Sequence, residues 1–176
     1  QNIKSNLKNN ELKISKNNYF LIKNEKEIDS WINEAEDSGE IAIDTETSSI
    51  NPHLADLVGI SLSTKIGKAC YIPIGHTFKG CINRDIVLNK LKPMLEDVSI
   101  KKIGQNIKFD FIIFHKYGIK ISSMEDTMLM SYVLDAGKNR HNMDVLSEIH
   151  LGHKTIKFKD LVGTGKKQIN FSEVPL

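Results

Sequence analysis

Three apolar, strand-like runs follow one another early in the 176-residue chain, at Ile41–Glu46, Leu57–Ser63 and Ala69–Ile74. The segments between them are rich in Ser, Asn and Pro or consist of Lys65–Lys68, and they are too short for a crossover helix. Because parallel neighbours need such a crossover, the three runs predict an antiparallel meander. This meander restricts the fold strongly, since it fixes three adjacent strands of one sheet.

Helical and strand-like segments alternate around the meander. A strand at Tyr19–Ile22 and a helix at Glu25–Asp37 are expected before it; after it we expect helices at Asp85–Leu95, Asn106–Tyr117, Asp126–Leu134, Met143–Leu151 and Phe158–Val162 and a strand at Ile100–Ile103. This pattern predicts an α/β fold with a central mixed β-sheet flanked by helices. Residues 1–17 are polar and lack periodicity, so we interpret them as a linker or arm and residues 18–176 as one domain.

Composition excludes few classes of function. No apolar run approaches the roughly 20 residues of a membrane helix, and the first twenty residues lack the apolar core of a secretory signal, so we expect a cytoplasmic protein without a membrane partner. Cys70 and Cys81 form no C-x-x-C pair, which argues against a zinc site or a disulfide framework. The net charge of +2 permits a nucleic-acid partner but does not by itself indicate one.

The segment IAIDTET carries two acids at alternating positions. Asp44 and Glu46 project from the same face of the expected strand, because side chains alternate across a strand. Two adjacent carboxylates repel each other unless a proton or a cation compensates them, and a divalent metal ion bound through oxygen does so. Such a pair is also common at a solvated strand end, and the spacing alone favours that plainer reading.

A third acid follows in GQNIKFDFIIFHKYGI. Asn106 and Asp110 are four residues apart and would share one face of the expected helix, while Ile107, Phe111 and Phe114 form its apolar stripe. Asp110 is therefore expected beside a core-facing surface. Spacing does not exclude a surface acid that pairs with a nearby lysine.

Taken together these motifs resemble the 3'-5' exonuclease domain of the bacterial DNA polymerase I family. The resemblance rests on Asp44-x-Glu46, Gly104-Gln105-Asn106-x-Lys108-x-Asp110, Asp126-Thr127-Met128-Leu129, Arg140-His141-x-Met143-Asp144-x-Leu146, His153-Lys154-Thr155-Ile156-x-Phe158 and Gly163-x-Gly165-Lys166, and it extends from about Tyr19 to the last residue. It implies a ribonuclease-H-like exonuclease fold and hydrolysis of the 3'-terminal phosphodiester of single-stranded or mismatched DNA, for proofreading, by two divalent ions.

The resemblance also implies roles for particular residues. Asp44 would bridge both ions, Glu46 would bind the ion that carries the attacking water, and Asp110 would support the second ion through water. The ions would be Mg²⁺ or Mn²⁺, with Zn²⁺ as an alternative at one site. Substrate contacts would come from six residues: Ile50 and Phe158 against the terminal bases, Gln105, Asn106 and Arg140 at the sugar or phosphates, and Thr45 as a further substrate-binding residue. Without the resemblance, Ile50 and Phe158 read as core or loop packing.

Basic residues recur along the chain as well. Two clusters are visible, Lys101, Lys102 and Lys108, and later Lys154, Lys157, Lys159, Lys166 and Lys167. They give modest support to a DNA track.

The family pattern continues with a Tyr-x-x-x-Asp motif that this chain does not reach before Leu176. We therefore expect the last helices of the fold to be missing, the isolated fragment to be a weak or inactive nuclease, and a polymerase module to follow in the parent protein. Two alternatives stay open. One is an RNA 3'-5' exonuclease like ribonuclease D, and the other is a non-catalytic nucleic-acid-binding scaffold that retains the fold.

Overall fold

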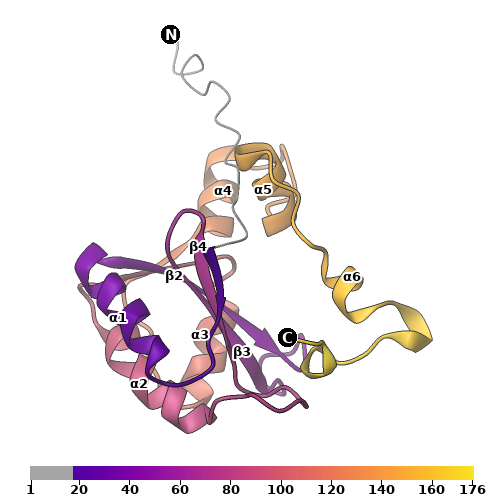
Figure 1. Cartoon of the computed structure of the whole chain (residues 1–176). Coiled ribbons are helices and arrows are strands. Elements are labelled where there is room, and N and C mark those ends of the chain that lie inside the picture. Colours follow the sequence, from indigo (N-terminus) through magenta and orange to yellow (C-terminus); the bar gives the residue numbers. More distant parts are fainter. Residues whose placement is uncertain (1–17) are drawn as a thin grey trace.

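The computed structural model describes residues 18–176, so the linker or arm expected at residues 1–17 lies outside the described part of the chain. Its centre is a six-stranded sheet in the order β1-β4-β3-β2-β5-β6 (Figure 1). The strands are β1 (Tyr19–Leu21), β2 (Glu40–Thr47), β3 (Leu57–Lys65), β4 (Lys68–Pro73), β5 (Lys101–Gly104) and β6 (Met124–Asp126).

The predicted meander is confirmed. β2 pairs antiparallel with β3 and β3 antiparallel with β4, whereas β1–β4, β2–β5 and β5–β6 are parallel, so the sheet is mixed. The register of β2 against β3 shifts between Glu46 and Thr47, directly after the expected acids. β6 was not predicted, because a three-residue strand is too short to show a period of two.

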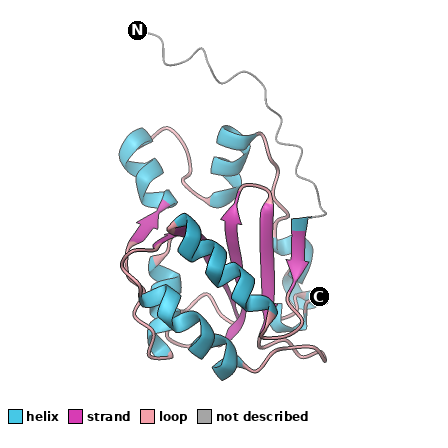
Figure 2. Cartoon of the chain, turned by 60° about the vertical axis from the view of Figure 1, so that its left-hand side comes forward, coloured by secondary structure: helices cyan, strands magenta, loops and turns pink. Residues whose placement is uncertain are grey.

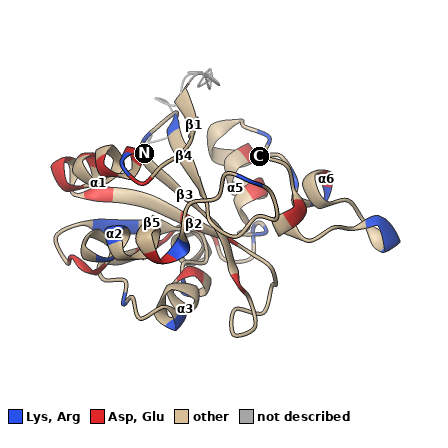
Figure 3. Ribbon diagram, turned by 60° about the horizontal axis from the view of Figure 1, so that its bottom comes forward, with Lys and Arg blue, Asp and Glu red and all other residues tan. Residues whose placement is uncertain are grey.

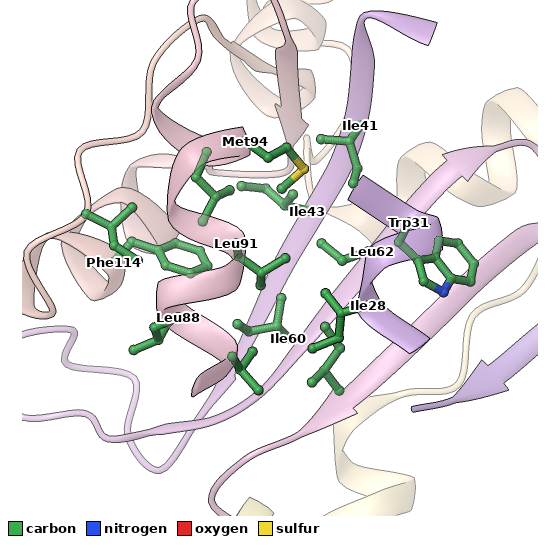
Figure 4. Packing of buried hydrophobic residues seen from close by; sticks show 14 of the residues in the cluster. Ile28, Trp31, Ile41, Ile43, Ile60, Leu62, Leu88, Leu91, Met94 and Phe114 are labelled. Carbon is green, nitrogen blue, oxygen red and sulfur yellow. The ribbon is translucent and has the colours of Figure 1, made fainter. Parts of the chain in front are cut away.

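Helices α1 (Glu27–Ser38) and α2 (Arg84–Glu96) lie side by side over one face of the sheet (Figures 1 and 2). Their apolar stripes meet Ile41, Ile43 and Ile60 of the central strands; Figure 4 shows this packing, with Ile28 and Leu91 fully buried. α3 (Lys108–Lys116) adds Ile113 and Phe114 to the same core. The main core therefore lies between the central strands and helices α1, α2 and α3.

The later elements pack much less tightly. Helices α4 (Thr127–Asp135) and α5 (Met143–Leu151) contain no buried residue, and α6 (Phe158–Val162) buries Val162. Two short 3₁₀ turns follow, η2 (Gly165–Lys167) and η3 (Phe171–Glu173). Figure 1 shows α6 and η2 to one side of the main body, with η3 returning toward the sheet. The other expected helices and strands are present; α5 and α6 have the expected bounds, and the ends of the rest are shifted by one or a few residues.

Two expectations for individual residues were wrong. Lys102, assigned to a basic surface cluster, is fully buried, and its Nζ donates to the main-chain oxygens of Asp97 at 2.5 Å and Ile100 at 2.6 Å. The helix expected from Asn106 begins at Lys108, because Asn106 has a φ of 59° and lies in the turn before it. Within residues 18–176 no helix is long and apolar enough to span a membrane.

Candidate active site

The two acids of β2 lie where alternation placed them. Along Glu40–Thr47, Ile41, Ile43 and Thr45 are buried while Asp44 and Glu46 are half-buried on the other side of the strand. Their partners across the sheet are Ser61 and Gly59 of β3, which are small. The side chains of Asp44 and Glu46 therefore share a face of the sheet that no bulky neighbour on β3 covers.

Asp110 reaches β2 from the first turn of α3. It is 2% exposed, and its Oδ1 accepts hydrogen bonds from the main-chain N–H of Thr45 at 2.9 Å and from Thr45 Oγ1 at 2.6 Å. Thr45 stands between the other two acids, so these bonds fix Asp110 beside Asp44 and Glu46. The alternative of a surface acid paired with lysine is wrong.

Burial and neighbouring acids raise the pKa of all three carboxyl groups. Burial, and then the charges of Asp110 and Glu46, raise the pKa of Asp44 to about 7, and burial with the charge of Asp110 raises the pKa of Glu46 to about 7. Burial raises the pKa of Asp110 to about 6, against the lowering effect of the Thr45 hydrogen bonds. Asp44 and Glu46 are therefore half-buried beside another acid and do not form a fully solvated strand end.

Among residues 18–176, no basic side chain forms an ion pair with any of the three acids. The same residues contain no three His, Cys, Asp or Glu side chains close enough to hold one ion together. Uncompensated carboxylate oxygens are donors suited to Mg²⁺ or Mn²⁺, which keep several water ligands, so the residues present fit a divalent cation.

A cavity of about 440 Å³ brings four of the predicted residues together. Glu46, Ile50, Asn106 and Phe158 line it, with Phe171. Ile50 is 95% exposed in the loop after β2, so its reading as core packing is wrong. Phe158 is 54% exposed, and its ring stacks on that of Phe171. The cavity therefore joins a half-buried acid to exposed apolar side chains.

Asp44 and Gln105 face a different cavity, of about 660 Å³, between the sheet and helices α4 and α5. The Gln105 amide is used within the protein, since Nε2 donates to the His141 main-chain oxygen at 2.7 Å and Oε1 accepts from Thr127 Oγ1 at 2.5 Å. Arg140 is exposed between α4 and α5 and lines neither cavity. The structure thus divides six of the nine predicted site residues between two cavities, whereas Thr45, Asp110 and Arg140 line neither.

The turn before α3 depends on Asp126, which the sequence did not single out as a site residue. Its carboxylate accepts from the main-chain N–H groups of Asn106 at 3.0 Å and Ile107 at 3.1 Å, and also from Met128 at the start of α4 at 2.9 Å. One acid thereby holds Asn106 in its left-handed conformation, which asparagine tolerates. The only sign of this role in the local sequence is that Asp126 stands at the N-cap position of α4.

Tyr71 and His76 line a further cavity together with Glu46, and the sequence did not indicate either of them as a site residue. The Tyr71 ring covers Gly59, where an added Cβ would lie 1.9 Å from Tyr71 Oη. Tyr71 Oη and His76 Nε2 are 2.7 Å apart, and His76 is 8% exposed. Burial, and then the charge of Glu46, raise the pKa of Tyr71. A glycine inside an apolar strand is a general sign of such a close approach.

The basic residues form no continuous track in the first predicted cluster. Lys101 pairs with Glu125 at 3.0 Å, and Lys102 is buried. Figure 3 shows basic residues at the tip beyond α6, where η2 carries Lys166 and Lys167, and acidic residues along α1. The second cluster thus remains at the surface, away from the core.

Comparisons with known proteins place this geometry in a family. A profile described as 3'-5' exonuclease matches residues 19–174. DNA polymerase I of Pseudomonas aeruginosa is 40% identical over 164 residues, and that of Rhizobium leguminosarum is 40% identical over 179 residues. Each match covers 90% of this chain and 18% of the relative, so the chain spans less than a fifth of these relatives.

Solved structures agree on the fold. Brucella melitensis NrnC is 25% identical with a TM-score of 0.60, over 79% of this chain and 62% of that one. Ribonuclease D of Escherichia coli, at 20% identity and a TM-score of 0.63 over 86% of this chain and 39% of its own, supports the fold alone. The expected ribonuclease-H-like exonuclease fold is confirmed, and the chain belongs to the family of 3'-5' exonuclease domains, hydrolases homologous to the proofreading domain of DNA polymerase I.

Proposed function

We propose that this chain removes nucleotides from the 3' end of single-stranded or mismatched DNA, as the proofreading exonuclease of a DNA polymerase I. One observation carries the proposal: Asp44, Glu46 and Asp110 gather at the middle of the sheet without an ion-pair partner among the described residues, and burial together with neighbouring acids raises their pKa values. Folding alone gives no reason to keep such charges together. Exonucleases of this family depend on divalent metal ions.

Asp44 and Glu46 would hold two ions, Mg²⁺ or Mn²⁺, with Asp110 assisting through water. When bound, such ions stabilise the attacking and leaving oxygens of a phosphodiester. Asp44 is the central ligand in this proposal, because its pKa responds to both other acids. Thr45 contributes by holding Asp110, through two hydrogen bonds to Oδ1.

The cavity beside Glu46 would receive the terminal nucleotide. Ile50 and Phe158 present exposed apolar surface there, and such surface accepts any base because every base has a stackable face. Asn106 lines the same cavity and is suited to contact the sugar or phosphate. Gln105 would act indirectly, since its amide holds His141, the neighbour of the exposed Arg140. Arg140 is left to meet the DNA backbone.

The first test replaces Asp44 with Asn, which removes a ligand charge and keeps the shape. We expect the loss of a direct metal ligand to lower the rate of nucleotide release from the 3' end by more than about 100-fold. Loss of a residue that only orients a ligand costs up to about 100-fold. The measurement is degradation of labelled single-stranded DNA in Mg²⁺ or Mn²⁺, in the parent polymerase. Asp56→Asn changes an exposed acid on the loop after β2 and is the matched control. An active Asp44→Asn variant would disprove the assignment.

An RNA substrate is the second candidate, because the structural neighbour NrnC, at 25% identity, was solved bound to pGG. The same assay with RNA and DNA oligonucleotides of one sequence separates the two. We expect DNA to be degraded faster. A clear preference for RNA would favour the ribonuclease-like function.

The 176-residue chain by itself should be a slow nuclease. It contains no Tyr-x-x-x-Asp after Gly165, and the cavity of about 660 Å³ beside Asp44 stays open between the sheet and two helices without buried residues. In this proposal a tyrosine and a further acid orient the attacking water, and a misplacement of about 1 Å costs about 100-fold in rate. Extending the chain by about 35 residues, roughly one helical hairpin, should restore the rate. Equal rates for both lengths would contradict the proposal.

A further inference from the structure

Residues 168–174 close one side of the cavity beside Glu46. Gln168, Ile169, Asn170 and Phe171 all line it. The Asn170 side chain donates from Nδ2 to the main-chain oxygen of Ser48 at 3.0 Å, in the loop that carries Ile50. The segment is therefore attached directly to the part of the chain that follows the acidic strand.

Phe171 stands at the centre of a row of rings. Its ring lies 6.0 Å from that of Phe158 at an interplanar angle of 11°, and 5.9 Å from that of His76. His76 in turn lies 2.7 Å from the Tyr71 hydroxyl, measured from Nε2 to Oη. Since Tyr71 belongs to β4, the row connects Phe158 to the rigid sheet through Phe171.

The helix that carries Phe158 is anchored to the rest of the protein by one buried residue, Val162. α6 has five residues, and Figure 1 shows it beside the main body, after an extended connection from α5. The main-chain N–H of Ile169 donates to Val162 at 2.9 Å, and that of Thr77 donates to Ser172 at 2.9 Å. Residues 168–174 thus join α6 to the loop after β4.

We infer that Phe171 is a positioning residue that holds the Phe158 ring as a stacking surface for the 3'-terminal base, an inference that rests on the proposed function. The Phe171 ring lies nearly parallel to the Phe158 ring at 6.0 Å, and Phe158 stays 54% exposed beside the cavity. A ring fixed before the substrate arrives loses less conformational freedom on binding. Without Phe171, Phe158 would stand on a short helix that no second ring supports.

The test compares two single-stranded DNA oligonucleotides that differ at the 3' end, one with a terminal thymidine and one with a terminal abasic residue. Binding to the chain is measured by fluorescence anisotropy, with Ca²⁺ in place of Mg²⁺ to slow hydrolysis. Wild type should prefer the complete end by roughly 5- to 150-fold, the range for one stacked base. Phe171→Ala and Phe171→Leu should bring the ratio close to that of Phe158→Ala, and Phe171→Tyr should restore it.

Phe78→Ala is the matched control. Phe78 stacks on the same His76 at 6.1 Å but lies outside the cavity, so its loss should leave the ratio unchanged. A Phe171→Leu variant that keeps the wild-type ratio, or a Phe78→Ala variant that loses it equally, would overturn the inference. Far-UV circular dichroism verifies that each variant is folded. If Phe171→Ala does not fold, the result for Phe171→Leu decides the test.

A second measurement needs no DNA. Hydrogen exchange of residues 158–162 should be faster in Phe171→Leu than in wild type, while α1 and α2 keep their protection. Unchanged exchange in α6 would overturn the inference even if DNA binds. Wild-type protein that fails to bind either oligonucleotide, with α6 still loosened by Phe171→Leu, would instead contradict the proposed function alone.

Discussion

Thr45 links a buried acid of α3 to the acidic strand at the scale of single residues. Its N–H and hydroxyl both donate to Oδ1 of Asp110, so a side chain from another element is held beside Asp44 and Glu46. Hydrogen bonds to a carboxylate are worth about 1.5–3 kcal/mol each. They stabilise the ionised form of Asp110. Its pKa therefore rises only to about 6, whereas the pKa values of Asp44 and Glu46 rise to about 7.

These pKa values predict how stability depends on pH without metal. Asp44 and Glu46 have folded-state pKa values of about 7, above their ordinary values near 4. The folded chain therefore binds more protons than the unfolded chain between about pH 4 and 7, and the free energy of unfolding falls as pH rises through that window. We expect a loss of about 1–3 kcal/mol between pH 5 and 8 in EDTA, since both groups are partly solvated.

Urea unfolding at the two pH values measures this loss. Asp44→Asn combined with Glu46→Gln should flatten the dependence, and Mg²⁺ should offset it for wild type, because it binds the ionised form. If the unfolding free energy of wild type in EDTA is the same at pH 5 and pH 8, the pKa values of Asp44 and Glu46 are not raised by folding.

At the scale of elements, the pairing of β3 with β4 depends on Gly59. An added Cβ would lie 1.9 Å from Tyr71 Oη and 2.2 Å from its Cζ, so Gly59→Ala must displace the ring and break its contact with His76. Overpacking of this kind costs about 1–3 kcal/mol. We expect Gly59→Ala to lower the unfolding free energy by that amount.

Chemical denaturation of a double-mutant cycle is the measurement. In Gly59→Ala the further change Tyr71→Ala should cost less than it does in wild type, because it removes the clash. Additive effects of the two changes would mean that the ring can move without cost.

Sequence patterns predicted elements best where local signals bound them. α5 begins after Asn142, whose side chain accepts from the N–H of Val145, and ends at Gly152 with a φ of 64°; both signals are visible in the sequence, and the predicted bounds are those observed. The start of α3 was mispredicted because Asn106 is held by Asp126, twenty residues away. A hydrogen bond between distant residues has no local pattern, and neither has the short strand β6.

For the whole molecule, the same distinction applies to the site. Strand alternation was sufficient to place Asp44 and Glu46 on one face, and the apolar stripe of α3 was sufficient to place Asp110 near the core. The neighbours of these acids were not predictable. Phe171 and His76 meet at 5.9 Å from positions far apart in the chain, and Gln105 binds within the protein through its amide. Such contacts depend on how loops return to the sheet.

The reactivity of the buried Lys102 amine measures how often the end of α2 separates from the sheet. Its amine is sealed between β5 and the end of α2, whereas Lys157 and Lys159 are exposed. An acylating reagent should modify the exposed amines at once and Lys102 only after the helix end leaves the sheet. Peptide mass spectrometry over time would measure the rate at which Lys102 is acylated, which gives the rate at which this part of the core opens. Immediate acylation of Lys102 would mean that the end of α2 is already loose in the folded protein.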